Sequence, residues 1–130
     1  VCGTAEYIAP EMIREEGHSY PLDWWTLGIA TYEMLVGFCP FYSGIHDKTN
    51  KKKNEMILNK EVTFPDKLKH GYELSEDAKD FIFKLLAKDP KERLGSKDDV
   101  EEVLNHNWLN GIDRFKIMSK SYKIPENEKP

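Results

Sequence analysis

One stretch of the chain, residues 22–36, is apolar on every face of the helix that it predicts. Its apolar positions are Leu22, Trp24, Trp25, Leu27, Ile29, Ala30, Tyr32, Met34, Leu35 and Val36. A helix that is hydrophobic all round is buried in the centre of a larger body. Gly37 and Pro40 mark its end, because glycine commonly follows the last helical residue and proline cannot continue a helix. We therefore expect a central helix over 22–36 that is more buried than any other element.

Two further helices are predicted in the second half of the chain. Ser75 is a good N-cap residue, and the acidic pair that follows it suits the positive end of a helix dipole. Helical spacing then relates Ala78, Phe81, Ile82, Leu85 and Leu86. Asp89-Pro90 stops this helix, which we expect over 75–87. A last helix, over about 98–107, starts near Ser96, has Asp99 as a partial capping box and buries Val100, Val103, Leu104 and Trp108.

The other segments give weaker patterns. Residues 1–11 are rich in Gly, Thr and Pro and predict a loop with one helical turn near its end. A helix from about His46 or Lys48 to Leu58 has a poor period, and residues 62–71 predict an extended connection. Residues 113–130 have few large apolar groups and predict a tail. No segment reads as a convincing strand, so the fold class is mainly α, without a sizeable sheet.

Composition places the chain among globular proteins and removes several classes of function. Hydrophobic residues make up 39% and charged residues 32% of 130 residues, which is enough for one core. The net charge of −4 gives no reason to expect nucleic acid as a partner, and the basic run 51–53 predicts a solvated loop. The chain has four histidines, at positions His18, His46, His70 and His106. Their spacing is not that of metal ligands, so no metal site is proposed.

Targeting signals and cysteines favour an intracellular protein. The chain shows no N-terminal signal segment and no apolar run of membrane-spanning length, so we expect no membrane insertion. Its two cysteines, Cys2 and Cys39, do not make a disulfide framework, and a reducing, cytoplasmic location is the default.

Several short motifs follow one another in a known order. Residues 2–11, Cys-Gly-Thr-Ala-Glu-Tyr-Ile-Ala-Pro-Glu, close with the Ala-Pro-Glu triplet of the protein kinase signature set. The blocks that follow are Pro-Leu-Asp-Trp-Trp-Thr-Leu-Gly at 21–28, Tyr-Glu-Met-Leu-Val-Gly at 32–37, Pro-Phe at 40–41, Leu-Leu-Ala-Lys-Asp-Pro at 85–90 and Arg-Leu-Gly at 93–95. Each block alone is weak evidence, but together they are very specific. Residues 1–112 resemble the C-lobe of a eukaryotic Ser/Thr protein kinase of the AGC type, and residues 113–130 resemble the start of the AGC C-terminal tail.

The resemblance implies that the first residues seat the substrate peptide. Thr4 would bridge the Asp and Lys of the catalytic loop, because a hydroxyl can both donate and accept. Val1, Ala5 and Ile8 would line the pocket for the side chain after the phospho-acceptor, and Tyr7 belongs to the same substrate-binding set. Proline is usual where Ala5 stands, and alanine there loosens the loop because proline would fix its φ angle.

Two carboxylates are candidates for substrate specificity. Glu6 and Glu33 match acidic positions that attract arginines upstream of the phospho-acceptor in AGC kinases. Glu33 lies inside the apolar helix, where an unpaired carboxylate is costly, so it has either this recognition role or a buried hydrogen bond, for example to Tyr7. A plain surface position is the alternative for Glu6. The expected partner is a protein or peptide substrate with upstream basic residues.

Three more residues have structural roles by the same resemblance. Glu11 and Arg93 would form a buried ion pair, for which the planar fork of arginine is well suited. Asp23 would accept hydrogen bonds from the backbone of the catalytic loop, or would simply favour the helix dipole. If Asp23 is buried without that loop, its charge costs several kcal/mol. Residues 46–57 are longer and more basic than the matching family segment and predict a surface bulge.

The chain contains no Gly-rich phosphate loop, Val-Ala-x-Lys strand, His-Arg-Asp loop or Asp-Phe-Gly. We therefore expect ATP and Mg²⁺ to bind only in a longer parent, and no catalytic residue in this segment. Three interpretations stand: part of an active AGC kinase, a pseudokinase or interaction module that does no chemistry, and an unrelated α-helical binding domain. The intact substrate-binding residues favour the first, and the sequence upstream of Val1 would separate the first two.

Overall fold

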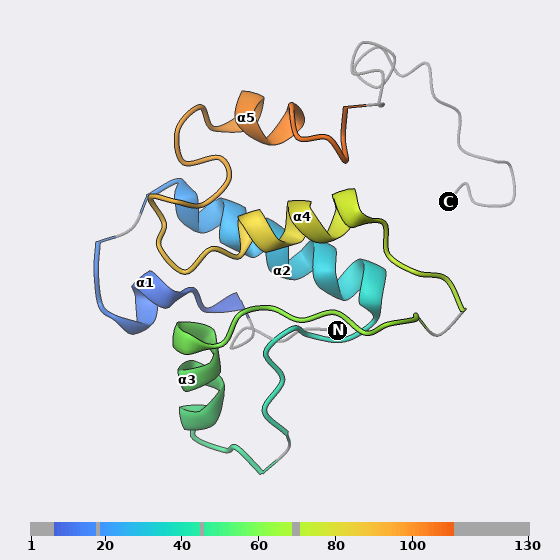
Figure 1. Cartoon of the computed structure of the whole chain (residues 1–130). Helices are drawn as coiled ribbons and strands as arrows, with labels where there is room; N and C mark the ends of the chain where they lie inside the picture. The colour runs from blue at the N-terminus through green and yellow to red at the C-terminus, as the bar shows by residue number, and fades with distance from the viewer. Residues whose placement is uncertain (1–6, 18, 45, 69–70, 111–130) are drawn as a thin grey trace, which may run out of the picture.

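The computed structural model describes residues 7–17, 19–44, 46–68 and 71–110, and within these ranges it is helical without strands. The helices are α1 (Pro10–Ile13), α2 (Pro21–Val36), α3 (Lys51–Asn59), α4 (Glu76–Leu85) and α5 (Val100–Leu104). Long connections join them, and α1 and α3 lie below the α2–α4 pair while α5 lies above it (Figure 1). The predicted fold class, mainly α without a sizeable sheet, is confirmed over these described residues. The predicted tail 113–130 and Cys2 lie outside the described residues.

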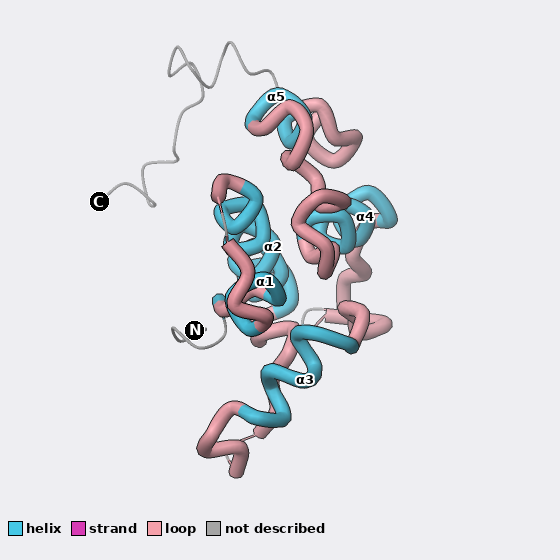
Figure 2. The backbone as a smooth tube through the Cα atoms, turned by 90° about the vertical axis from the view of Figure 1, so that its left-hand side faces the viewer, coloured by secondary structure: helices cyan, strands magenta, loops and turns pink. Residues whose placement is uncertain are grey.

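The core forms where α2 and α4 pack side by side, as both ribbon views show (Figures 1 and 2). Gly28 of α2 permits this close approach, since a Cβ there would lie 2.7 Å from Leu86 Cδ2 and 2.9 Å from Leu85 Cβ. The larger core cluster consists of Ala9, Trp25, Ile29, Tyr32, Val36, Phe41, Ile57, Val62, Leu74, Ala78, Ile82 and Leu86. A smaller cluster of Phe81, Leu85 and Val103 joins α4 to α5. Trp108 packs against both clusters.

Helix α2 has the predicted bounds but not the predicted burial all round. Pro21 occupies its first turn, and Gly37, with φ of +101°, closes it by donating its N–H to Glu33 O at 2.8 Å. The helix contributes more buried residues than any other, yet Met34 is 73% exposed. Met34 shares its face with Asp23 and Thr26, which are also exposed. That face is uncovered because α4 packs on the opposite side, against Gly28.

Helix α3 begins later than predicted, and its basic start is not a solvated loop. The Asp47 carboxylate accepts the backbone N–H groups of Lys52 and Lys53 at 3.3 and 2.9 Å, and the Ser43 hydroxyl donates to it at 2.7 Å. The hydrogen bond from Ser43, with those from the α3 backbone, lowers the pKa of Asp47. Lys53 is only 7% exposed, so the expectation of a surface bulge is wrong at this residue. Asp47 satisfies amide groups that would otherwise be unpaired at the start of α3.

Helix α5 is shorter than the predicted 98–107 because a side chain takes the preceding amides. Glu102 accepts the backbone N–H groups of Gly95, Lys97 and Asp98 at 2.9, 3.0 and 3.0 Å. Asp99 has a φ of +52°, which is incompatible with a helix. The turn over 95–99 therefore replaces the first predicted helical residues. Helix α4, in contrast, starts as predicted, with Ser75 Oγ accepting from Ala78 N at 3.1 Å.

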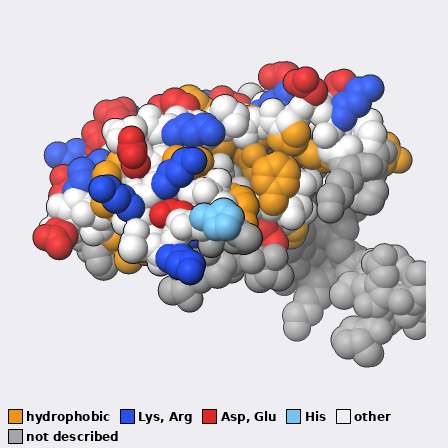
Figure 3. Space-filling view, turned by 90° about the horizontal axis from the view of Figure 1, so that it is seen from below, with side chains coloured by type: hydrophobic (Ala, Val, Ile, Leu, Met, Phe, Trp, Pro, Cys, Tyr) orange, Lys and Arg blue, Asp and Glu red, His pale blue; other side chains and the backbone are white. Residues whose placement is uncertain are grey.

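The view from the α3 side shows an uneven surface (Figure 3). Lys and Arg side chains gather with acidic ones on one half, and apolar side chains gather towards the other. None of the described helices is both long and apolar enough to cross a membrane.

Candidate functional site

The structure describes only part of the expected substrate seat. Val1, Thr4, Ala5 and Glu6 lie outside the described residues, so their predicted roles stay predictions. Tyr7 and Ile8 are half-buried directly before α1, and Tyr7 packs against the core cluster around α2. The chain then becomes fully buried at Ala9 and Pro10. These contacts hold the segment that leads into α1 against the centre of the molecule.

Glu33 lies in the last turn of α2 and is half-buried. Its neighbour Tyr32 donates its hydroxyl hydrogen to Thr63 O at 2.8 Å, and the ring of Tyr32 contacts Phe38 and Phe64. These contacts fix the end of α2 to the segment before α4. Glu33 therefore stands on a rigid support, as a recognition residue requires.

Asp23 is exposed in the first turn of α2. Because Asp23 is exposed, its charge does not carry the free-energy cost of a buried, unpaired carboxylate. Its position agrees with the simpler interpretation of a carboxylate at the positive end of a helix dipole.

Glu11 and Arg93 form the predicted ion pair, although 82 positions separate them. Arg93 Nη1 donates to Glu11 Oε2 at 2.7 Å, and Nη2 donates to Oε1 at 2.9 Å. The Arg93 side chain is 0% exposed and the Glu11 side chain is 1% exposed. Burial by itself raises the pKa of Glu11. The hydrogen bonds and the charge of Arg93 lower this pKa by a larger amount, so the net shift is downward. Glu11 is thus held as a carboxylate inside the protein.

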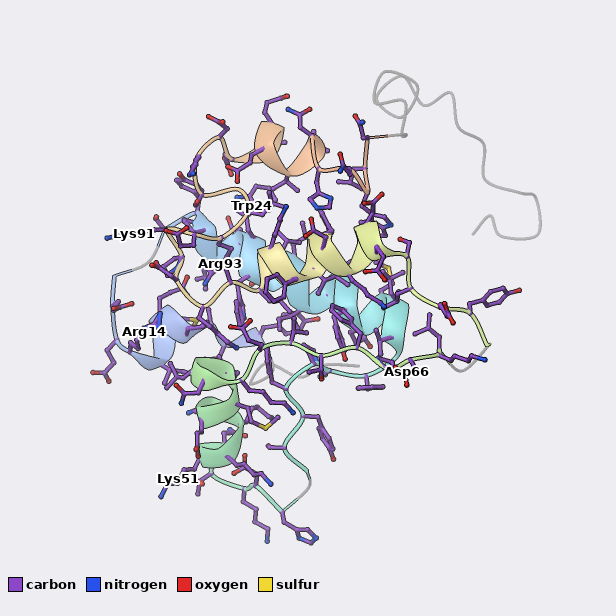
Figure 4. The ribbon with its side chains drawn as sticks, in the orientation of Figure 1. Arg14, Trp24, Lys51, Asp66, Lys91 and Arg93 are labelled. Carbon is purple, nitrogen blue, oxygen red and sulfur yellow. The ribbon has the colours of Figure 1, made fainter. Side chains whose placement is uncertain are left out.

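Arg93 also contacts three other residues. Its Nε donates to Ala87 O at 3.1 Å and its Nη1 donates to Pro21 O at 2.9 Å. Its guanidinium carbon lies 5.1 Å from the centre of the Trp25 ring. Figure 4 shows Arg93 pointing inward from its segment while Lys91 points outward. Arg93 therefore joins α1, the start of α2 and the chain after α4 at one point.

The sequence pattern predicted no special environment for Lys88. Its Nζ lies 4.1 Å from the centre of the Phe41 ring and 5.6 Å from that of Trp25, and the two rings stack with centres 5.9 Å apart. Burial lowers the pKa of Lys88 to about 8, against a raising effect of Glu61. Lys88 stands within the Leu-Leu-Ala-Lys-Asp-Pro block, but only the fold shows that aromatic rings surround it.

His106 was likewise named only as a residue without metal-ligand spacing. Its Nδ1 accepts the backbone N–H of Trp108 at 3.0 Å, so its ring proton is on Nε2, which donates to Asp80 Oδ2 at 2.7 Å. The ring of His106 also packs edge-on against Phe81. Among the described side chains no group of His, Cys, Asp and Glu could hold a metal ion.

The sequence matches the family model of the protein kinase domain over residues 1–109. It is 42% identical over 125 residues to the serine/threonine-protein kinase sck2 of Schizosaccharomyces pombe, covering 95% of this chain and 18% of that protein. It is 40% identical over 130 residues to the RAC serine/threonine-protein kinase of Drosophila melanogaster, covering 99% and 19%. It is 36% identical over 126 residues to the cAMP-dependent protein kinase type 3 of Saccharomyces cerevisiae, covering 96% and 29%.

The chain belongs to the protein kinase domain family. Its relatives are Ser/Thr protein kinases of the AGC group, as the motif order predicted. The chain spans less than a third of the length of the relatives that it matches.

Proposed function

We propose that this chain is the substrate-docking and structural part of an AGC Ser/Thr kinase that transfers the ATP γ-phosphate to basic protein substrates. ATP and Mg²⁺ bind in the whole protein, and this segment by itself holds neither. Residues 1–112 form the C-lobe portion, 113–130 begin the C-terminal tail, and the enzyme works in the cytoplasm. The observation that carries the proposal is the buried Glu11–Arg93 pair, which fixes α1 directly after Tyr7 and Ile8.

Docking follows from how these residues are supported. Tyr7 and Ile8 keep part of their surface accessible while the chain after them is locked into the core. Val1, Thr4, Ala5 and Glu6 extend this seat in the proposal. Glu33, on the rigid end of α2, binds an arginine upstream of the phospho-acceptor, since a carboxylate accepts both arms of a guanidinium.

The uncovered face of α2 supports the rest of the proposal. Leu27, Ala30 and Met34 share this face with Asp23, and Met34 is largely exposed. The apolar positions of this face are suited to packing against a second layer of helices. The neighbouring carboxylate is suited to accepting hydrogen bonds from backbone N–H groups of that layer. We assign this face to the remainder of the kinase domain, including the catalytic loop.

A pseudokinase or interaction module is the alternative from another class. Such a protein would keep the Glu11–Arg93 anchor and the core, since both are architectural, and would lose only the phosphoryl-transfer residues. A transfer assay with the full-length protein separates the two, because labelled phosphate on a peptide requires those residues.

The experiment that tests docking uses Glu33→Gln in the full-length protein with peptides that contain or lack the upstream arginine. Gln keeps the shape and removes the charge, so KM for the arginine peptide should rise more than KM for the other peptide. Glu92→Gln is the matched control, because Glu92 is exposed on the segment between α4 and α5. An unchanged ratio between the two peptides would show that Glu33 is structural and would remove the basic-substrate assignment.

A further inference from the structure

A groove lies outside the site described above, where the α1–α2 connection faces the α4–α5 connection. The residues that line its first cavity, of about 320 Å³, include Glu11, Ser19, Tyr20, Lys91, Ser96 and Lys97. A second cavity, of about 550 Å³, contains Arg14, Glu16 and Asp89. The two cavities share Gly17, Pro90 and Lys91, so they form one continuous groove. Figure 4 shows Arg14 and Lys91 at this same end of the molecule.

Hydrogen bonds between the two connections hold the groove open. The Tyr20 hydroxyl donates to Ser96 O, and Arg14 Nη2 donates to Lys88 O at 3.0 Å. Ser96 Oγ donates in turn to Lys91 O at 2.9 Å, which supports the Lys91 backbone. Because both connections are tied to each other, a ligand finds the walls already in place and the entropy cost of ordering them is small.

The first cavity has an excess of positive charge. Lys91 and Lys97 are exposed, and neither forms a side-chain ion pair among the residues that the structure describes. Glu11 also lines this cavity, and its carboxylate is already neutralised by both arms of Arg93. The carboxylate of Glu102 already accepts three backbone N–H groups; these hydrogen bonds outweigh the effect of burial and lower its pKa, and the charge of Lys97 adds to them. This excess stands out on a chain whose net charge is −4.

The second cavity is mixed in charge. Arg14 Nε donates to Glu16 at 3.2 Å, and Asp89 Oδ1 accepts the backbone N–H of Lys91 at 2.9 Å. Such a surface offers both donors and acceptors to a polypeptide backbone. The residues that line the groove are largely exposed, so the groove does not enclose a ligand as a small-molecule pocket does.

We propose that this groove binds a phosphorylated peptide, with the phosphate of a phosphoserine or phosphothreonine between Lys91 and Lys97 and the peptide chain across the second cavity. A phosphate monoester carries a charge of about −1.5 to −2 at neutral pH, which matches two ammonium groups. Ser19 lines the same cavity and offers a hydroxyl donor to the same phosphate. The groove acts as a docking site for a phosphorylated partner, and this binding does not require phosphoryl transfer by the kinase.

The test measures binding of a fluorescent phosphoserine peptide with Gly and Ala flanks to the full-length protein that contains this chain. The Lys91→Ala/Lys97→Ala double variant should bind it about tenfold more weakly or worse, because bonds to a charged group are lost. Lys67→Ala is the matched control, since Lys67 is exposed and lies outside the groove. Any contribution from the ATP site or the substrate seat is common to these proteins and cancels in the comparison.

Two further arms decide whether the ligand is a phosphopeptide. The unphosphorylated peptide should bind much more weakly than the phosphorylated one, and excess inorganic phosphate should compete only at far higher concentration, because it engages the first cavity alone. Equal affinities of the double variant and the Lys67→Ala protein would overturn the proposal. Equal binding of the two peptides would overturn it as well. Competition by inorganic phosphate at concentrations similar to those of the peptide would refute the role of the second cavity.

Discussion

Gly95 lies directly against the indole of Trp24. A Cβ added to Gly95 would lie 2.4 Å from Trp24 Cδ1 and 2.5 Å from its Nε1. The same Nε1 donates to Asp99 Oδ1 at 2.9 Å, so the turn before α5 wraps around the Trp24 side chain. This contact attaches the last helix to α2, and it explains why the Arg-Leu-Gly block ends in glycine.

Gly95→Ala should lower the free energy of unfolding by about 2–4 kcal/mol, measured by urea unfolding. Two costs add up: the φ of +97° is unfavourable for alanine, and the new methyl group overlaps the Trp24 ring. Gly44→Ala is the matched control, because Gly44 has the same φ of +97° but nothing within 4 Å of its added Cβ. If both variants lose the same stability, the contact with Trp24 contributes nothing.

Arg93→Ala should destabilise the protein by about 3–5 kcal/mol, because the carboxylate of Glu11 would be left buried without its partner. Lys79→Ala removes the exposed pair with Glu76 and should cost less than about 1 kcal/mol. Arg93→Lys should recover only part of the loss, since an ammonium cannot bind both carboxylate oxygens and two backbone carbonyls in the same geometry. The melting temperatures of the three variants rank their losses of stability. A small decrease of the melting temperature for Arg93→Ala would contradict the role of Arg93 as an anchor.

Lys88 predicts an unusual pH dependence of stability. Its pKa is about 8 in the folded chain against 10.5 as the reference, so the unfolded chain binds this proton more tightly. The free energy of unfolding therefore rises with pH between those two values. Tyr32, whose pKa burial raises above 10.0, stays protonated in most of this range.

The measurement is urea unfolding at several pH values from about 7 to about 9.5, on the wild type and on Lys88→Met. Methionine keeps the contact with Phe41 and removes the titrating group, so its stability should change less with pH over this range. Lys67→Met is the control with the same chemical change at an exposed site. Equal slopes for all three proteins would mean that Lys88 titrates as an ordinary lysine.

The purified chain of 130 residues should transfer no phosphate from ATP-Mg²⁺ to an arginine-rich peptide. It has no phosphate-cradling loop and no Asp-Phe-Gly aspartate to hold the metal, and these groups supply the catalysis in kinases. The full-length protein under the same conditions is the positive control. Incorporation of labelled phosphate by the short chain, retained after repurification, would contradict this.

Local signals predicted the helices whose ends depend on nearby residues. Ser75 caps α4 and Gly37 closes α2, and each acts within a turn of its own position. Asp47 and Glu102 were not recognised because their carboxylates reach amides across intervening residues, which a search for a residue at the N-cap position does not detect. The start of α3 and the length of α5 were misjudged for this reason.

The candidate site shows the same division between motif and three-dimensional packing. The pairing of Glu11 with Arg93 came from the order of motifs, since no local pattern relates positions so distant in the chain. The exposure of Met34 could not come from periodicity, because an apolar helix face looks the same whether or not another layer covers it. The aromatic contacts of Lys88 depend on Phe41 and Trp25, which only the fold brings together.

The hydrogen bonds of Arg93 end on three different parts of the chain: two on Glu11 in α1, one on Pro21 in α2 and one on Ala87 after α4. None of these segments can detach without breaking bonds to one shared, fully buried cation. They should therefore open as a single cooperative unit, and amide hydrogen exchange in α1 should slow down or speed up together with that of the residues after α4. A single arginine thereby makes the local unfolding of separate segments one event.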